Sequence, residues 1–286
     1  MSAQPLVSIV MPAYNAERTI AEAIRSVIAQ TYPNWELVGV DDGSKDGTAE
    51  IAGSFHDPRI HLVRQANTGI GGARNKALDL VRGDFLCMLD SDDVMPPESI
   101  RARLDLLVRS PEVDFCDGRV TMKDEHLAQV VRRYAPRFRG APFRELIKLN
   151  GSCFFGVTWM VRLQPHRDVR FHTRITHAED LLFYLEMSHQ RGLYDHVDEE
   201  VLLCRRTPGS SMSNLDGLER SYHYLLDWLK ARPRYTTPRE RRWFAWRIRR
   251  IMAGSYWHQG RKWKALKALL VRPSGVQPQS VPSTSA

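Results

Sequence analysis

Hydrophobic positions follow two alternating patterns over the first 120 residues of the chain. Short, nearly continuous apolar runs predict buried strands. These runs lie at 6–11, 35–40, 59–63, 84–89 and 113–120. Between the runs, apolar residues recur every three or four positions, which predicts amphipathic helices. We expect these helices after an N-cap at Asn15 and over 44–55, 73–81 and 98–110. Strands that alternate with such helices predict an α/β fold with a mostly parallel sheet flanked by helices.

The pattern is less regular between residues 121 and 213. A strand is predicted over 152–161, and a second strand over 201–213 is expected to run into a turn. A helix is predicted to begin at a capping box formed by Thr176 and Glu179 and to end at Gly192.

The remaining chain predicts helices only. An amphipathic pattern spans 214–231, the capping box "TPRE" at 237–240 opens a basic, Trp-rich helix, and a short helix follows Gly260. These patterns predict three parts. They are an α/β domain over 1–213 with halves at 1–120 and 121–213, a basic helical extension over 214–271, and a disordered tail over 272–286.

Polar residues follow the predicted strands of the first half. In parallel sheets, ligands bind beyond the carboxyl ends of the strands, so these residues are expected to share one edge. The strand ends carry Pro12, Ala13, Tyr14 and Asn15 after the first strand, Asp41 after the second, Asn67 after the third, and Asp90, Ser91, Asp92 and Asp93 after the fourth.

Asp90 and Asp92 form an unusual concentration of negative charge at the end of an apolar run. If both residues continue the strand, their side chains share one face, roughly 6–7 Å apart. At an effective dielectric constant of about 20, their repulsion is about 2–3 kcal/mol. This arrangement predicts a cation that compensates the charge.

The net charge of +8 is not evenly distributed over the 286 residues. Residues 239–267 contain ten Lys or Arg and one Glu, which gives a local charge of +9, so the rest of the chain sums to −1. The four cysteines show no CxxC spacing and are expected to be buried free thiols. No apolar stretch is long enough to span a membrane, and no basic residue precedes the first apolar run, so a cytoplasmic protein without a secretory signal is expected.

The segments "VSIVMPAYNAERTIAEAIRSVIAQTYPNWELVGVDDGSKDGT", "NTGIGGARNKAL" and "FLCMLDSDD" together resemble the donor half of family 2 inverting glycosyltransferases of the GT-A fold. The later "AEDLLFYLEM" and "RRTPGSSMS" also resemble segments of that family. The resemblance covers residues 5–120 most closely. It implies a UDP-sugar donor, a glycan or lipid-linked acceptor, and a role in bacterial surface polysaccharide assembly, such as lipopolysaccharide or exopolysaccharide synthesis.

The same resemblance implies roles for individual residues. Residues 90–92 correspond to the DxD motif, which implies Mn²⁺ or Mg²⁺ held directly by Asp92, with Asp90 supporting the metal or the ribose. Asp180 is implied as the base that deprotonates the acceptor, with Glu179 either beside it in the site or mainly in its capping box. Residues implied to bind the nucleotide sugar are Pro12, Ala13, Tyr14, Asn15, Asp41 (to the uracil N3–H), Asn67, Arg74, Asp90, Ser91, Arg206 and Ser211.

Three alternatives compete with an active glycosyltransferase. A sugar-nucleotide nucleotidyltransferase would carry a Gly-rich loop and a basic residue after the first strand, and "MPAYNAE" lacks both. A basic nucleic-acid-binding protein is disfavoured because the positive charge lies in one segment without a known binding motif. An inactive scaffold is disfavoured by the intact Asp92 and Asp180. For 239–267, two interpretations stay open: peripheral attachment to an anionic membrane, or Arg stacked on Trp within a helix bundle.

Overall fold

The computed structural model describes residues 4–189, 191–206 and 214–270. The chain divides into two compact units. The first comprises residues 1–146 and 150–210, and the second comprises 147–149 and 211–286. The predicted tail at 272–286 lies outside the described residues.

Within the described residues of the first unit, eight strands form one mixed sheet. They are β1 (Val7–Ala13), β2 (Trp35–Asp41), β3 (Ile60–Arg64), β4 (Phe85–Met88), β5 (Val113–Lys123), β6 (Val130–Tyr134), β7 (Met160–Arg162) and β8 (Leu193–Arg205). The order is β3-β2-β1-β4-β7-β5-β6, with β8 paired to β5. Strands β3, β2, β1 and β4 are mutually parallel, and β7 is antiparallel to both β4 and β5.

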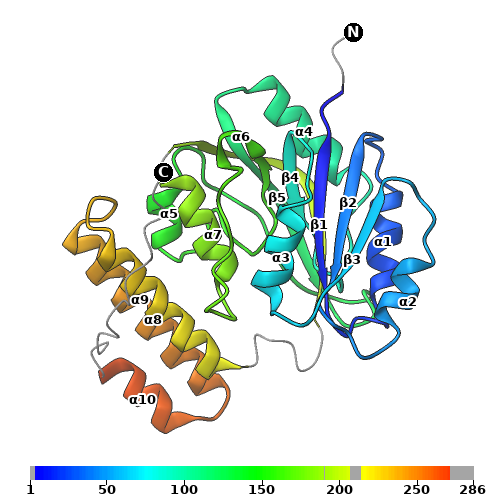
Figure 1. The fold of residues 1–286 in the computed structure, drawn as a ribbon. Helices are drawn as coiled ribbons and strands as arrows, with labels where there is room; N and C mark the ends of the chain where they lie inside the picture. The colour runs from blue at the N-terminus through cyan, green and yellow to red at the C-terminus, as the bar shows by residue number, and fades with distance from the viewer. Residues whose placement is uncertain (1–3, 190, 207–213, 271–286) are drawn as a thin grey trace. The chain divides into compact units, whose positions relative to one another are not determined.

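Helices surround this sheet (Figure 1). They are α1 (Ile20–Ile28), α2 (Thr48–Gly53), α3 (Ile70–Leu78), α4 (Ser99–Arg109), α5 (Phe143–Ile147), α6 (Leu163–His166) and α7 (Glu179–Ser188). Helix α3 packs on β1 and β2, and α4 packs on β5 and β8. All seven residues of β1 and all seven of β2 are buried, because both faces of the central strands are covered. This double coverage explains why their sequences are apolar runs rather than alternating patterns.

Several predicted boundaries are wrong because side chains bind backbone groups there. Helix α1 begins at Ile20 after an N-cap at Thr19, not at Asn15. Asn15 has a positive φ of 50°, and its Oδ1 accepts a hydrogen bond from the Lys45 backbone N–H at 2.9 Å. Helix α2 begins at Thr48 rather than at residue 44, and the Thr48 N–H donates to Asp46 Oδ1 at 3.1 Å.

The segment 152–159 is irregular, and of the predicted strand only Met160 and Val161 pair in the sheet, within a strand that ends at Arg162. The indole of Trp159 is buried and donates to the Cys153 carbonyl at 2.9 Å, which folds the segment back on itself. The strand predicted over 201–213 instead begins at Leu193 and ends at Arg205. Its predicted turn over 207–213 lies outside the described residues.

The second unit contains α8 (Leu215–Ala231), α9 (Pro238–His258) and α10 (Lys262–Leu270). The capping box predicted at the start of α9 is confirmed: Thr237 Oγ1 accepts from the Glu240 N–H at 3.2 Å, and Glu240 Oε2 accepts from the Thr237 N–H at 2.7 Å. Tyr256 of α9 donates to Asp216 and Glu219 of α8, which ties these helices together. None of the described helices is long and apolar enough to cross a bilayer.

Candidate active site

The ends of β1 and β2 bring together the first group of predicted site residues. Ala13 and Asp41 are paired in the parallel register of the two strands. Pro12 and Ala13 are buried, whereas the next residue, Tyr14, projects from the strand end and is half exposed. The backbone N–H of Asn15 donates to Ser44 Oγ at 2.9 Å, which fixes the turn after β1 against the turn after β2.

The two carboxylate oxygens of Asp41 have different surroundings. Its Oδ1 accepts a hydrogen bond from the Ser44 N–H at 3.2 Å. Its Oδ2 forms an ion pair with Arg64 Nε at 3.0 Å, but the angle is unfavourable for a hydrogen bond, so this oxygen accepts none from the described residues. Arg64 is held in place by a second contact, from its Nη2 to the Ser44 carbonyl at 2.9 Å.

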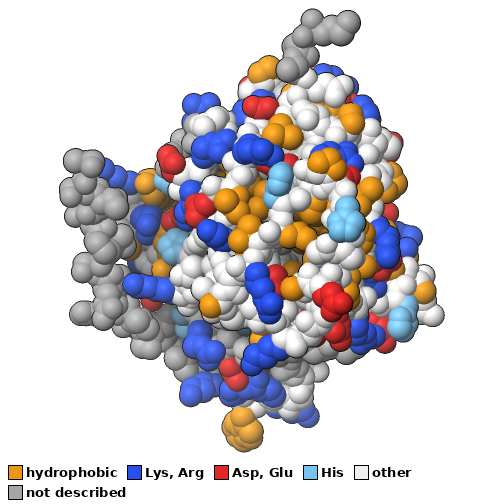
Figure 2. Space-filling view, turned by 45° about the vertical axis from the view of Figure 1, so that its right-hand side comes forward, with side chains coloured by type: hydrophobic (Ala, Val, Ile, Leu, Met, Phe, Trp, Pro, Cys, Tyr) orange, Lys and Arg blue, Asp and Glu red, His pale blue; other side chains and the backbone are white. Residues whose placement is uncertain are grey.

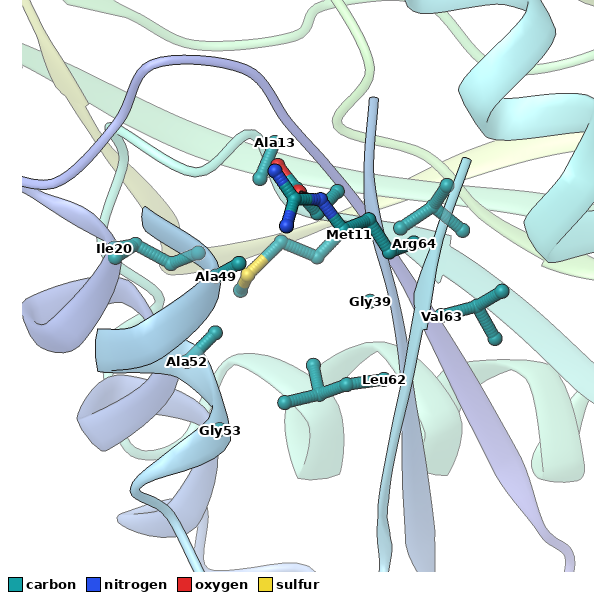
Figure 3. A pocket seen from close by; sticks show the side chains of 12 residues that line it. Met11, Ala13, Ile20, Gly39, Ala49, Ala52, Gly53, Leu62, Val63 and Arg64 are labelled. Carbon is teal, nitrogen blue, oxygen red and sulfur yellow. Dashed lines mark ion pairs between the residues drawn. The ribbon is translucent and has the colours of Figure 1, made fainter. Parts of the chain in front are cut away.

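A cavity of about 130 Å³ lies directly beside Asp41 and Arg64. Figure 3 shows the Arg64 guanidinium extending over Met11 toward Ala13, while Ala52, Gly53 and Leu62 line the other end. The cavity is therefore apolar inside, with an ion pair at the strand ends. A flat heterocycle with an N–H donor would suit this combination of apolar wall and acceptor oxygen.

Asp42 organises the following loop and does not face the cavity. Its carboxylate accepts from the N–H groups of Thr68 at 2.9 Å and Gly69 at 2.8 Å. The Asn67 side chain donates to the Asp42 carbonyl at 2.9 Å. Asn67, which the family resemblance assigned to nucleotide binding, thus has its amide nitrogen bound to the backbone of this loop.

Residues 89–93 form a turn rather than an extension of β4. The strand ends at Met88, and the Asp93 N–H donates to the Asp90 carbonyl at 3.0 Å. The expectation that Asp90 and Asp92 continue the strand is therefore wrong. Burial and then the nearby charge of Asp90 raise the pKa of Asp92 to about 6, so the two carboxylates of the turn still interact.

Asp93 and Arg205 hold this turn in place. Asp93 is buried and accepts from the Arg205 N–H at 2.8 Å, while Arg205 Nε donates to the Asp92 carbonyl at 2.7 Å. Asp93 is thereby committed to the fold, which leaves Asp90 and Asp92 as the two acids of the turn suited to a metal. Among the described residues, no group of three or more His, Cys, Asp or Glu side chains forms a metal site by itself. Two hard oxygen donors fit a divalent ion that takes its other ligands from a diphosphate.

Arg74 links this turn to a distant part of the chain. Its side chain is 2% exposed, and it donates to Asp90 Oδ1 and to Glu179 Oε1, both at 2.8 Å. Burial opposes its charge, but Asp90, Glu179 and Asp180 outweigh this effect and raise the pKa of Arg74. Its Nε is buried without a partner in the described structure. Arg74 thus serves mainly as a bridge between carboxylates.

The start of α7 carries the predicted base. Ala178 precedes the helix with a positive φ of 54° and makes no side-chain cap, so the predicted capping box between Thr176 and Glu179 is wrong. The physical reason is the buried Arg74, which binds the Glu179 carboxylate. The Thr176 hydroxyl lies 2.9 Å from His177 Nδ1 instead.

The side chain of Asp180 is partly exposed, but its surroundings disfavour the ionised carboxylate. Burial and then the charge of Glu179 raise the pKa of Asp180 to about 7, against the opposing effect of Arg74. Its Oδ1 accepts from the Leu181 N–H at 2.7 Å. Its Oδ2 faces the loop at 151–158, since a Cβ built on Gly156 would lie 3.8 Å from that oxygen. A carboxylate with this pKa suits general base chemistry near neutral pH.

Helix α3 is fastened to the segment before α7 by reciprocal hydrogen bonds. Asn75 Nδ2 donates to the Phe171 carbonyl at 2.9 Å, and the Phe171 N–H donates to Asn75 Oδ1 at 2.7 Å. The Phe171 ring also lies 5.1 Å from the Arg74 guanidinium. A Cβ on Gly71 would meet the His172 carbonyl at 3.2 Å, so this close approach favours glycine.

The structure thus brings Arg74, Asp90, Glu179 and Asp180 together. Two further predicted site residues follow β8 in the sequence. Arg206 is exposed, and its N–H donates to the Lys123 carbonyl at 2.8 Å. Ser211 lies outside the described residues. Sequence analysis missed Arg64, Arg205 and Gly156, because their roles depend on contacts with distant residues. Only Arg64 had a signal in the sequence, since it directly follows the apolar run at 59–63.

Comparison with known proteins gives a consistent result. Residues 8–170 match the family model described as Glycosyl transferase family 2. The Escherichia coli UDP-Glc:alpha-D-GlcNAc-diphosphoundecaprenol beta-1,3-glucosyltransferase WfgD is 43% identical over 185 residues, which cover 64% of this chain and 69% of WfgD.

Two solved structures share the fold. S. aureus TarS 1-349 in complex with UDP-GlcNAc aligns with a TM-score of 0.63 and 21% identity, over 92% of this chain and 71% of TarS 1-349. The Pyrobaculum calidifontis mannosyltransferase PcManGT in complex with GDP-Man and Mn²⁺ aligns with a TM-score of 0.60 and 19% identity, over 95% of this chain and 78% of that one. These likenesses confirm the expected GT-A fold.

Proposed function

Because this chain belongs to glycosyl transferase family 2, we propose that it transfers a sugar from a UDP-sugar to a hydroxyl group of a glycan or lipid-linked acceptor, with inversion at the anomeric carbon. The membership itself makes the protein a glycosyltransferase and disfavours the nucleotidyltransferase and nucleic-acid-binding alternatives. The donor, the stereochemistry, the metal and the base are the proposed parts.

One observation carries the proposal: Arg74 bridges Asp90 of the 89–93 turn and Glu179 beside Asp180. The carboxylates suited to the donor diphosphate and the carboxylate suited to the acceptor therefore belong to one charge cluster. A direct displacement needs the leaving group and the attacking hydroxyl on opposite sides of one carbon atom, and this cluster supports such a site.

In the proposed reaction, Asp180 accepts the proton of the acceptor hydroxyl while that oxygen bonds to the anomeric carbon. The bond from this carbon to the β-phosphate oxygen breaks, and UDP leaves with the electron pair. General base assistance of this kind accelerates a reaction about 10²–10⁴-fold. Asp180 Oδ2 is the proposed acceptor atom, because Oδ1 is already bonded to the Leu181 N–H.

On the donor side, Asp41 Oδ2 is proposed to accept the uracil N3–H at the edge of the apolar cavity. Asp90 and Asp92 are proposed to hold Mn²⁺ or Mg²⁺, which would stabilise the negative charge of the departing diphosphate. Burial and then the charge of Asp90 raise the pKa of Asp92, so a cation bound at this turn would favour its ionised form.

The acceptor class is proposed by analogy with WfgD, whose name specifies a diphosphoundecaprenol-linked GlcNAc acceptor. We propose a lipid-linked saccharide of this type, and a role in the assembly of a cell-surface polysaccharide.

The decisive test is a donor screen on the purified chain. UDP-sugars, GDP-mannose and CDP-sugars are each incubated with Mn²⁺ and a GlcNAc-diphosphate-lipid, and nucleoside diphosphate release is measured. We expect release from a UDP-sugar, loss of release on chelation, and an inverted anomeric configuration in the product by NMR. Release from a GDP-sugar alone would contradict the uracil-binding role of Asp41. Retention of configuration in the product would contradict the role of Asp180.

A further inference from the structure

Tryptophan exposure differs sharply between two parts of the chain. The three tryptophans outside 239–267, namely Trp35, Trp159 and Trp228, are at most 5% exposed. The four inside that segment are all exposed: Trp243 by 49%, Trp246 by 41%, Trp257 by 55% and Trp263 by 86%. Because an exposed indole leaves a large apolar area in water, four in one segment indicate a surface that meets a partner.

The exposed side chains of α9 form one stripe. Arg239, Trp243, Trp246, Arg250 and Trp257 recur at helical spacing and are all exposed. The apolar side chains that pack inside the second unit occupy a different face of the helix. They are Phe244, Ile248, Met252 and Tyr256. The tryptophans of the stripe are therefore not part of the core of this unit.

Helix α10 repeats the arrangement. Its small residues Ala265 and Ala268 are buried, whereas Trp263 and Leu266 point outward beside exposed Lys267. Figure 2 shows Lys and Arg side chains gathered around a projecting hydrophobic side chain at its lower margin.

Eight of the ten basic residues of the segment fall into two sets; of the other two, Arg241 binds the Thr236 carbonyl and Arg249 has a buried Nε. One set is engaged within the second unit: Arg247 binds the Leu149 carbonyl, and Arg261 and Lys264 bind Asp216. The other set is exposed and forms no ion pair with an acid among the described residues. It comprises Arg239, Arg242, Arg250, Lys262 and Lys267.

Stacking of cations on the indoles does not account for this surface. Arg250 lies 4.9 Å from the Trp246 ring, Lys262 lies 5.6 Å from the Trp257 ring, and the Trp243 and Trp246 rings are 4.8 Å apart. These contacts leave every ring at least 41% exposed. The contacts fix the positions of the indole rings but do not bury them.

We propose that residues 239–267 form a docking surface for an anionic lipid bilayer, with the indoles in the headgroup region and the exposed Arg and Lys on lipid phosphates. Indole rings favour the membrane–water interface, and basic residues are attracted to anionic lipids. Charge complementarity selects lipid over a protein partner, because the described part of this segment presents five exposed cations that form no ion pair and a single acid, Glu240, which is engaged in the helix cap. The inference is independent of the proposed reaction, since it requires neither donor nor acceptor.

Vesicle flotation tests the docking surface with the full chain. We expect the protein to float with phosphatidylcholine vesicles that contain phosphatidylglycerol, and to stay unbound with phosphatidylcholine alone or in high salt. The variant Arg239→Gln, Arg242→Gln, Arg250→Gln should lower the partition coefficient on the order of 100-fold. A matched control, Arg25→Gln, Arg132→Gln, Arg133→Gln, removes the same charge from exposed positions of the first unit and should bind like the parent.

Tryptophan fluorescence gives a second readout that a purely electrostatic contact would not change. Since the other three indoles are buried, acrylamide quenching reports mainly on the segment. Anionic vesicles should shift the emission to shorter wavelength and reduce quenching, and Trp243→Ala with Trp263→Ala should weaken flotation while thermal unfolding is unchanged. Absence of flotation at low salt, equal loss in the control variant, or binding to duplex DNA in place of vesicles would each overturn the proposal.

Discussion

The guanidinium of Arg74 and the carboxylate of Glu179 form a buried ion pair at 2.8 Å, although 105 positions separate them in the chain. Because Arg74 also binds Asp90, one cation compensates two acids from different segments. The pair fixes the start of α7, and with it Asp180, against the 89–93 turn.

Replacing Arg74 should destabilise the protein more than replacing an exposed arginine. Arg74→Met leaves Glu179 buried without its partner, and breaking a buried pair in this way costs about 3–5 kcal/mol. The exposed pair between Arg119 and Asp198 provides the control, since Arg119→Met should cost at most about 1 kcal/mol. Urea unfolding measures both, and equal free energies of unfolding would show that Arg74 is not a structural bridge.

Asp180→Asn should lower kcat by about 10²–10⁴ while the affinity for UDP stays close to that of the parent. An isosteric amide preserves the shape of the site but cannot accept the proton. Steady-state kinetics and calorimetry measure the two quantities separately. A loss smaller than tenfold would remove Asp180 as the base.

The pH dependence of kcat/KM should follow the ionisation of Asp180. A base must be ionised to act, and burial and Glu179 raise the pKa of Asp180 to about 7. We therefore expect kcat/KM to fall about tenfold per pH unit below pH 7. Glu179→Gln removes a neighbouring negative charge, so this acid limb should move to lower pH. An unchanged or higher apparent pKa in that variant would contradict the assignment.

Asp92→Asn should abolish the enhancement of UDP binding by Mn²⁺ and leave the fold intact. The amide is isosteric but removes the charged oxygen that a hard divalent cation prefers. Calorimetry with and without Mn²⁺ gives the affinities. Asp198→Asn, at an 83% exposed side chain, is the matched control and should retain the enhancement. Metal-enhanced binding in Asp92→Asn equal to that of the parent would rule out this ligand.

Asp41→Asn and its neighbour Asp42→Asn should have different effects. Asp41→Asn should weaken UDP binding by about 1–3 kcal/mol and reduce the preference for UDP over CDP, because the amide can donate to the base where the carboxylate only accepts. Asp42→Asn should instead lower thermal stability, since Asp42 binds the Thr68 and Gly69 N–H groups. If only Asp42→Asn changed the preference for UDP over CDP, the roles of Asp41 and Asp42 would be reversed.

Features encoded by neighbouring residues could be predicted from the sequence. The apolar runs of β1, β2 and β4 predicted buried parallel strands, which the structure confirms. The capping box of α9 was also predictable, because Thr237 and Glu240 satisfy each other within one helical turn. The comparisons confirm the family and the fold that these local patterns suggested.

Features that depend on distant contacts could not be predicted. Thr176 and Glu179 have the spacing of a capping box, but a buried arginine from α3 binds the glutamate. The segment 152–159 has the composition of a strand, but its tryptophan bonds to Cys153 and folds the chain back. Parallel pairing of β8 with β5 joins segments far apart in sequence, and no local pattern specifies it.

The reciprocal bonds between Asn75 and Phe171 limit how this enzyme can be recombined with its relatives. A chimera that takes residues up to 120 from one parent and the following residues from another would separate Asn75 from the backbone it binds, and Arg74 from Glu179. Residues 70–79, Asp90 and residues 171–180 should therefore be exchanged as one block. The two predicted halves of the first unit are then not freely interchangeable, because the contacts between these segments have to match.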